Sequence, residues 1–260
     1  MTKKWAGKIC IYDGIVFYLG YSGDSDAHKH YAVKIVLSYE GQVSIFSKDN
    51  QEIRDTGLVV PANTLHRVQA DGQQKVAFIF MEPYSKSGRA LLAQYPGGNK
   101  IFKLMPDVSS ACIRELGVIE QGVTSGNCDT KRIVSLLTGV NIKPQSIDER
   151  VQKTIYYIQN HLEEIESLES LAVILEISPR YLRKLFNQQV GMSLQRFRLW
   201  VKLRVALGHI AAGESFTMAA YAASFTDSAH FSRTFRSMFG IAPSEVMGTA
   251  NKLNDKQLTI

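Results

Sequence analysis

Three histidines in the N-terminal third of the chain have a spacing that could support metal binding. His28 and His30 are two residues apart ahead of a β-rich run, and His66 closes the segment 61–66. Neutral imidazole is a good ligand for zinc, iron or nickel, so three imidazoles that converge in a β structure could hold a divalent ion. The first acidic residue after His30 is Glu40, at an expected hairpin turn, so a nearby carboxylate ligand is missing. We therefore expect no cofactor and keep a divalent metal at these three histidines as an alternative.

A second group of candidate residues is basic and lies in the C-terminal half. The stretch between Glu176 and Glu214 contains no acidic residue and has a net charge of +7, from Arg180, Arg183, Lys184, Arg196, Arg198, Lys202 and Arg204. Between Asp227 and Glu245 the sequence again has no acid, but it has Arg233 and Arg236. Lys and Arg neutralise DNA phosphates, so both stretches are suited to DNA binding. The net charge of +6 on the whole chain permits a nucleic-acid partner without requiring one.

The elements that must position the histidines are short β-rich runs separated by turn residues. We expect strands over residues 15–19, 32–37, 42–46, 58–60 and 75–80, with turns at spacers such as 40–41, 48–50 and 70–72. This pattern predicts an antiparallel barrel or sandwich. After Pro83, apolar residues recur at intervals of three and four, which predicts helices over 87–94, 108–120 and 130–137.

The basic residues lie in a repeated pattern that predicts two helix-turn-helix units. In residues 168–186 the small Ala172 stands where two helices would cross, and Ser178-Pro179 opens the second helix. A second copy follows about 48 residues later, with Ala220 in place of Ala172 and Asp227 as the expected N-cap. The two copies share a trailing glycine and four apolar positions, with Ala223, Phe225, Phe231 and Phe235 in place of Leu175, Ile177, Leu182 and Phe186. Leu171 and Leu185 complete the expected core of the first copy.

One continuous helix is expected between the two copies, over residues 193–212. Its apolar residues are spaced to face the flanking units: Leu194, Phe197, Trp200, Leu203, Leu207 and Ile210. Twenty residues at 1.5 Å each span roughly 30 Å, close to the ~34 Å turn of B-DNA. The two second helices could therefore enter successive major grooves on one face of the duplex.

This arrangement resembles the AraC/XylS family of bacterial transcriptional regulators. The resemblance rests on residues 182–186, 224–235 and 239–243, and it extends over about residues 147–248. One departure is that the family usually has glycine in each turn, where this sequence has Glu176 and Ser224, so these turns would be strained or reshaped. The resemblance implies a monomeric DNA-binding domain that recognises a promoter site and recruits or positions RNA polymerase.

By this resemblance, the base-contact candidates are exposed positions of the two second helices: Arg180, Arg183, Lys184, Ala229, His230, Ser232 and Arg233. The phosphate-contact candidates are Arg196, Arg198, Lys202, Arg204 and Arg236. Each could instead be an ordinary surface residue, and His230 could cap the core beside Phe231. We expect Arg183→Ala or Arg233→Ala to relax base preference, because arginine suits a bidentate contact with guanine, and Lys202→Ala to weaken binding to all sequences alike.

The N-terminal half resembles the cupin fold more weakly. Residues 61–66 are similar to the second cupin motif, with Asn63 where that motif has glycine. This resemblance implies a cupin-like barrel that senses a small molecule, with pocket candidates Tyr18, Tyr31, Ile35, Phe46, Phe78 and Phe80, although most of these must be ordinary core. In similar regulators the helices over 108–137 form a dimer or meet the DNA-binding domain, and packing of their apolar face on their own barrel is an equally good explanation.

Length and composition set the outer limits. The 260 residues, 45% of them hydrophobic, fit two modest domains and exclude a disordered or fibrous chain. No apolar run is long enough for a membrane span, and three cysteines without CxxC spacing favour the cytoplasm. The predicted organisation is a mainly β, cupin-like sensing and dimerisation domain with appended helices (1–143), an all-α DNA-binding domain with two helix-turn-helix units joined by a long helix (144–250), and a polar tail (251–260).

The leading hypothesis is a sequence-specific transcriptional regulator, an activator that responds to a small-molecule effector. Its expected partners are promoter DNA, RNA polymerase and a second copy of the chain, with no membrane. The alternative is a cupin-type metal-binding enzyme or metal sensor fused to a DNA-binding domain. Other enzyme classes have little support, because the sequence lacks a nucleophile elbow, a phosphate loop and paired carboxylates.

Overall fold

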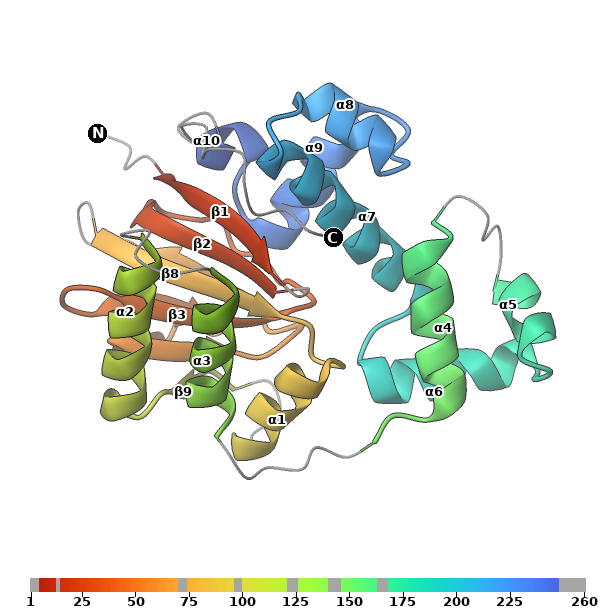
Figure 1. The fold of residues 1–260 in the computed structure, drawn as a ribbon, viewed down its shortest axis with the longest axis horizontal. Coiled ribbons are helices and arrows are strands. Elements are labelled where there is room, and N and C mark those ends of the chain that lie inside the picture. The colour runs from red at the N-terminus through yellow and green to blue at the C-terminus, as the bar shows by residue number, and fades with distance from the viewer. Residues whose placement is uncertain are drawn as a thin grey trace. The chain divides into compact units, whose positions relative to one another are not determined.

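The computed structural model of the protein describes residues 5–12, 15–69, 74–95, 100–120, 126–139, 146–162 and 168–247 (Figure 1). Contacts divide the chain into two compact units, one of Met1–Pro144 with Phe235–Ile260 and the other of Gln145–Thr234. The first division falls beside the predicted boundary at residues 143 and 144. The predicted tail, 251–260, lies outside the described residues, and the predicted domain organisation stays a prediction.

A six-stranded antiparallel sheet is the centre of the first unit. Its strands lie in the order β1 (Ala6–Tyr12), β2 (Ile15–Ser22), β8 (Gln74–Met81), β3 (Val33–Ser38), β6 (Gly57–Val60) and β9 (Phe102–Lys103). The register pairs Tyr18 with Phe78 and Lys34 with Phe80. Every residue of β3 is buried, so both faces of this sheet are covered near its middle.

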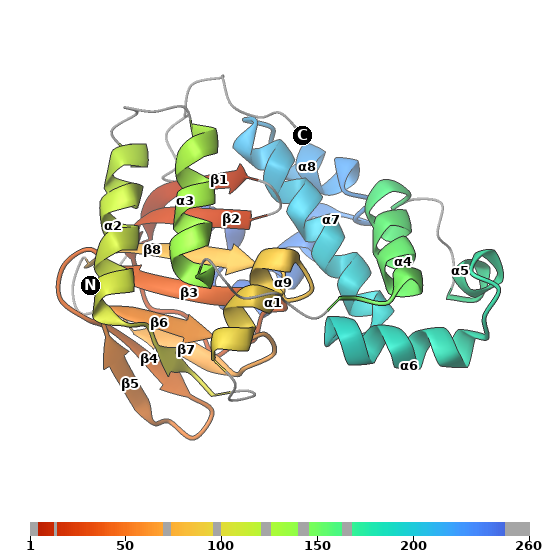
Figure 2. The ribbon, with the colours of Figure 1, turned by 60° about the horizontal axis from the view of Figure 1, so that its bottom comes forward.

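Three helices cover one face of the larger sheet: α1 (Lys86–Gln94), α2 (Pro106–Glu120) and α3 (Gly126–Thr138) (Figure 2). Odd-numbered strand residues such as Ile35 and Ile79 form a core with Cys112, Leu116 and Ile133 of these helices. Because side chains alternate along a strand, the even-numbered residues face away from the helices.

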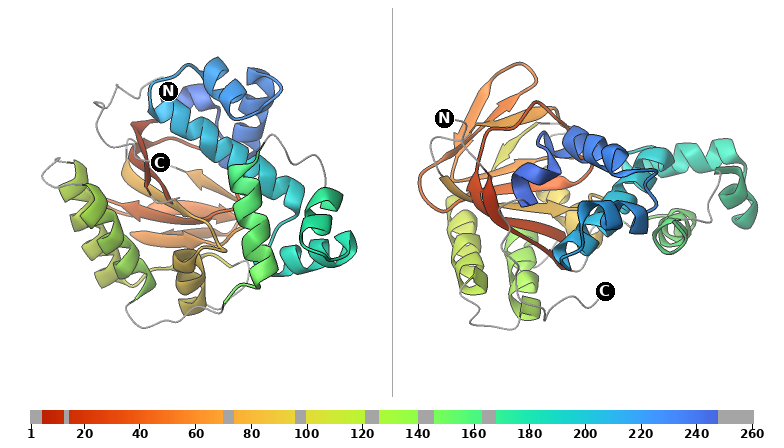
Figure 3. Two further views of the ribbon diagram at one scale, coloured as in Figure 1. Left: turned by 45° about the vertical axis from the view of Figure 1, so that its right-hand side comes forward. Right: turned by 90° about the horizontal axis from the view of Figure 1, so that it is seen from above.

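The smaller sheet has the strand order β5 (Glu52–Asp55), β4 (Val43–Ser47) and β7 (His66–Gln69). The right-hand view of Figure 3 shows the helices and the β4–β5 hairpin on opposite sides of the larger sheet. The predicted closed, cupin-like barrel is not found among the described strands, because β4, β5 and β7 pair with one another instead of closing the larger sheet. A mainly β unit with appended helices is the part of that prediction that the structure supports.

The predicted elements of this unit correspond to β2, β3, β4, β6 and β8 and to all three helices. The sequence reasoning did not single out β1, β5, β7 or β9. β5 is a four-residue edge strand with half-buried and exposed residues, and β9 has two residues. Strands this short and polar have no clear alternating pattern, so periodicity does not detect them.

The second half of the described chain is helical, as predicted. Its helices are α4 (Glu149–Asn160), α5 (Leu168–Ile174), α6 (Pro179–Val190), α7 (Leu194–Ala211), α8 (Phe216–Ala222), α9 (Ser228–Phe239) and α10 (Pro243–Met247). The last turn of α9 and all of α10 group with the first unit. Within the second unit, α4 packs against α6 and α7, and α7 packs against α8.

Side chains cap three helices of this half of the chain, and the two predicted caps, Ser178 and Asp227, are confirmed. The Ser178 and Ser193 hydroxyls accept hydrogen bonds from the N–H groups of Tyr181 and Arg196, at the starts of α6 and α7. The Asp227 carboxylate accepts from the N–H of His230, at the start of α9. The long helix, expected over 193–212, spans Leu194–Ala211.

In both turns the chain takes the left-handed conformation. Glu176 has φ +53° and Ser224 has φ +57°, where the resembling family has glycine. In each turn the following residue closes the end of the helix, since Ile177 N–H donates to Ala172 O and Phe225 N–H donates to Ala220 O. The two copies of the repeat therefore end their first helix in the same way. In each turn the left-handed residue, Glu176 or Ser224, has a side chain that makes this conformation unfavourable.

Among the residues that the structure describes, none of the helices has the length and apolar character needed to cross a membrane.

Candidate DNA-binding surface and histidine cluster

The two helix-turn-helix units are α5 with α6 and α8 with α9. At each helix crossing the predicted small residue is buried, with Ala172 1% and Ala220 0% exposed. The predicted core positions Leu182, Phe186 and Phe231 are also fully buried. Close approach of two helices requires a small side chain, so these alanines let the second helix of each unit dock on the first.

The outer faces of α6 and α9 are basic. Arg180, Arg183 and Lys184 on α6 and Arg233 on α9 are exposed. Among the described residues, no ion pair engages any of these four side chains. Their charges face solvent, where phosphates or base edges could approach, and their assignment as DNA contacts stays a prediction.

The other base-contact candidates of α9 divide into two kinds. Ala229 is exposed, whereas His230 and Ser232 are half-buried. The His230 ring lies edge-on against Phe225 at 5.3 Å between centroids, and its Nδ1 is 2.9 Å from the Thr226 hydroxyl. Ser232 Oγ donates to the Ser228 carbonyl at 2.8 Å. The alternative reading of His230, as a residue beside the core, agrees with these contacts.

Lys202 and Arg236, two of the phosphate-contact candidates, contact residues distant in the chain. Lys202 is half-buried, and its Nζ donates to the Ser224 carbonyl at 2.5 Å, so this cation supports the end of α8. Arg236 forms an ion pair with Asp26, at 2.8 Å between Nη2 and Oδ2. The remaining candidates, Arg196, Arg198 and Arg204, lie on α7. The sequence gives no signal for the Lys202–Ser224 and Arg236–Asp26 contacts, because each joins residues that are distant in the chain.

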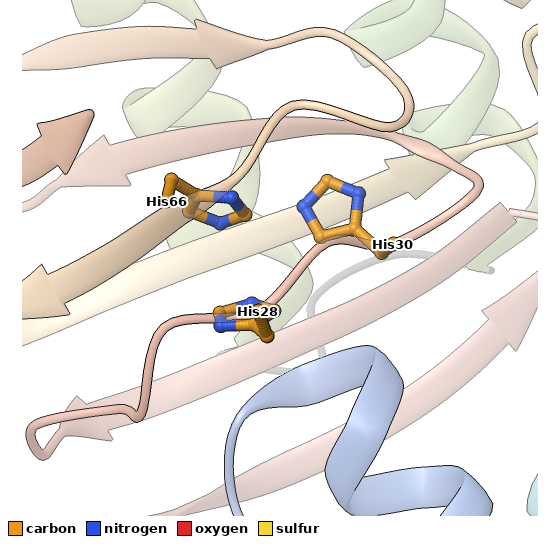
Figure 4. A group of neighbouring side chains, drawn as sticks. All are labelled: His28, His30 and His66. Carbon is orange, nitrogen blue, oxygen red and sulfur yellow. The ribbon is translucent and has the colours of Figure 1, made fainter. Parts of the chain in front are cut away.

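The three histidines of the first unit converge, as the sequence suggested. His28 and His66 exchange two backbone hydrogen bonds, of 2.9 and 3.0 Å, and Asn63 N–H donates to the His30 carbonyl at 2.8 Å. Ring centroids are 4.3 Å apart for His28 and His66, and 4.8 Å apart for His30 and His66. Figure 4 shows the imidazoles turned toward a shared space, two from the segment before β3 and one from the start of β7.

Burial keeps these rings neutral. It lowers the pKa of His28 to about 3, with the Lys34 charge adding to the effect, and it lowers the pKa values of His30 and His66 well below their usual range. Lys34 is itself only 3% exposed, and burial lowers its pKa to about 7. Its Nζ lies 4.3 Å from the centre of the Phe78 ring. The cluster is therefore a set of uncharged nitrogen donors at neutral pH.

The structure brings together only part of the predicted ligand pocket. Tyr18 and Phe78 stack at 5.6 Å between ring centroids, and Phe80 lies edge-on against His30 at 5.5 Å, all on the face away from the helices. Ile35 belongs to the core on the opposite face. Phe46 is half-buried beneath the Arg67 guanidinium. Tyr31 lies in the segment that connects β2 to β3. These six residues thus do not share one face, and a ligand pocket remains a prediction.

The predicted apolar face of α2 packs inside its own unit. Cys112 and Leu116 are fully buried against the larger sheet, with Val108 and Ile113 beside them. Burial raises the pKa of the Cys112 thiol to about 12, and Glu115 adds to this effect. Packing on the larger sheet of the same unit therefore accounts for the apolar face of α2.

Two capped, repeated helix-turn-helix units with basic outer faces define a DNA-binding protein of the helix-turn-helix class. Residues 171–248 match a family model described as a helix-turn-helix domain. A relative named "HTH-type transcriptional activator RhaS", from Escherichia fergusonii, is 35% identical over 116 residues, which are 43% of this chain and 39% of that protein. The C-terminal part of the chain is thus similar to a helix-turn-helix domain and to the corresponding part of this activator. The chain spans about two fifths of the length of such curated relatives.

Solved structures resemble the chain over nearly its whole length. An apo variant of ToxT from Vibrio cholerae aligns with a TM-score of 0.65 and 13% identity, covering 92% of this chain and 99% of that one. Wild-type ToxT with a bound unsaturated fatty acid aligns with a TM-score of 0.59 and 13% identity, covering 98% of this chain and 97% of that one. At this identity the likeness establishes the fold, with a sheet-rich N-terminal part and a helical C-terminal part. The curated relatives are named as transcriptional activators or regulators.

Proposed function

We propose that this protein is a sequence-specific transcriptional regulator that binds promoter DNA through α6 and α9 and activates transcription with RNA polymerase. The observation that supports this most strongly is the exposed basic face on the second helix of each helix-turn-helix unit. The name of the RhaS relative, an activator, supports the direction of regulation. The α7 helix has 18 residues, roughly 27 Å at 1.5 Å each, which suits two helices that enter neighbouring turns of a major groove.

The test is a comparison of specific and random DNA. A binding site selected from random sequences is labelled, and the affinity of the purified full chain for it is measured at several salt concentrations. We expect a specific site with two half-elements about one helical turn apart. Equal affinity for selected and random duplexes, with the same loss on adding salt, would show that the protein is not a specific regulator.

Single substitutions assign roles within the surface. Arg183→Ala and Arg233→Ala are each expected to cost about 1–3 kcal/mol at the selected site and to relax base preference there. Arg198→Ala, on the connecting helix, is the matched control and is expected to weaken both duplexes alike. Lys202→Ala is no longer a simple phosphate control, because its ammonium supports the carbonyl of Ser224. If all three arginine variants lose the same factor on both duplexes, the base-reading assignment is wrong.

We also propose that the first unit senses a small molecule. ToxT, whose fold this chain shares, has been solved with a bound unsaturated fatty acid. Tyr18, Phe78 and Phe80, on the face of the larger sheet away from the helices, are the residues that we expect such a ligand to contact. A screen of fatty acids and other small metabolites by thermal unfolding, followed by DNA binding with each stabilising compound, tests this. We also propose a second copy of the chain as a partner. Sedimentation with and without the selected DNA tests whether this homodimer forms.

A further inference from the structure

The side chains of His28, His30 and His66 are held by the backbone in one defined state. Each Nδ1–H donates to a main-chain carbonyl: His28 to Asp26 at 2.8 Å, His30 to Ala32 at 2.6 Å and His66 to Thr64 at 3.0 Å. A carbonyl oxygen can only accept, so in each ring the proton is on Nδ1. Each Nε2 then has a free lone pair and no proton.

These three Nε2 atoms are the unexplained feature of the first unit. All are buried, and none has a hydrogen-bond partner in the part of the chain that the structure describes. A buried acceptor without a partner costs about 1–3 kcal/mol of folding stability. Three of them in one cluster therefore destabilise the first unit considerably. One ring nitrogen from each residue lies within 4.8 Å of the others. A single electron-pair acceptor at the centre would satisfy all three.

We propose that His28, His30 and His66 bind one divalent transition-metal ion through their Nε2 atoms. Histidine ligands of metals typically donate their other nitrogen to a carbonyl or carboxylate, which fixes the ring and its tautomer. All three rings have this partner here. Tetrahedral zinc with bonds of 2.0–2.1 Å places its ligand nitrogens roughly 3.4 Å apart, which small rotations of the side chains can supply.

The donor set determines which ions fit. The group contains three imidazoles and no carboxylate or thiolate among the described residues. Magnesium and calcium prefer oxygen ligands, whereas imidazole suits zinc, cobalt, nickel and copper. Three protein ligands leave a fourth position for water or an exogenous donor. The site does not depend on the proposed DNA binding, since all three ligands belong to the first unit.

The experiment uses the full chain purified without an affinity tag and stripped with a chelator. Zinc is added in a calorimetric titration, and cobalt is added while its visible absorption is recorded. We expect one ion per chain, a tetrahedral cobalt spectrum and a higher unfolding temperature with metal. Failure of the wild-type protein to bind a stoichiometric ion of zinc or cobalt would overturn the proposal.

Variants identify the ligands. His66→Gln and His28→Gln are each expected to weaken zinc binding by more than about 100-fold, which exceeds the loss usual for an outer partner of a ligand. His209→Gln, on α7, is the matched control and should bind like the wild type. If the first two variants do not fold, zinc X-ray absorption of the wild-type protein still decides, because imidazole scatterers at about 2.0 Å are expected. Unchanged binding in both folded variants, or a zinc spectrum without imidazole, would contradict the assignment.

Discussion

The left-handed residues in the two turns lead to a prediction about stability. In this conformation a residue with a side chain costs roughly 1–2 kcal/mol, because Cβ crowds the following carbonyl. Glycine avoids this cost, although its greater freedom in the unfolded chain takes back about 0.4–1 kcal/mol. Glu176, with φ +53° and an exposed side chain, should therefore yield a net gain on substitution. We expect Glu176→Gly to stabilise the second unit by about 0.5–1 kcal/mol.

The assay is urea unfolding followed by tryptophan fluorescence. The chain has two tryptophans, Trp5 in the first unit and Trp200 in the second, so a Trp5→Phe background makes the signal report on the second unit. With a slope of about 2 kcal/mol per molar urea, the gain raises the midpoint by roughly 0.3–0.5 M. Ser224→Gly should behave alike, and the two gains should add because the turns are separate.

The control is Glu176→Ala, which removes the same charge but keeps Cβ. It should leave the midpoint unchanged or lower it, since the left-handed conformation is as costly for alanine as for glutamate. If Glu176→Ala raises the midpoint as much as Glu176→Gly, the gain comes from the lost carboxylate, and the argument from backbone strain is refuted.

Three further predictions concern single side chains. Gly191 and Gly240 have φ +78° and +71°, but only at Gly240 would an added Cβ meet backbone, 2.5 Å from Asp26 O. Gly240→Ala should thus lower the free energy of unfolding by about 1–3 kcal/mol more than Gly191→Ala in urea. Ala220→Leu should lose about 1–3 kcal/mol by overpacking, whereas exposed Ala222→Leu should not. Cys112, with a pKa of about 12, should resist iodoacetamide at pH 8 until the protein is unfolded, as peptide mass spectrometry would show.

Local sequence signals predicted the second unit well. Ser178 and Asp227 were identifiable as caps because capping depends on residues a few positions apart. The crossing alanines were identifiable because the repeat shows the same small residue twice. The unusual residue type at position 176 was visible only by comparison with a family pattern. The structure shows that Glu176 has the left-handed conformation that glycine adopts most easily.

Contacts between residues distant in the chain could not be predicted from the sequence. In β3 both faces are buried, so alternation does not tell which residues face the helices, and Ile35, a pocket candidate, lies in the core on the helix side. Lys202 has the spacing of a phosphate contact, but its partner lies 22 residues away. The histidines could be grouped by type, whereas the convergence of their rings depends on how β7 lies beside the segment before β3.

The return of the chain to the first unit at Phe235 has a consequence for biosynthesis. Phe239 stacks edge-on against Phe80, and the Gly240 carbonyl accepts from the N–H of Asp26. A nascent chain released before residue 235 would contain every strand of this unit but none of these contacts. Because domains tend to fold as they emerge from the ribosome, the first unit should wait for the end of translation to complete its packing. Premature termination within α9 should therefore impair the β-rich part of the protein as well as the second helix-turn-helix.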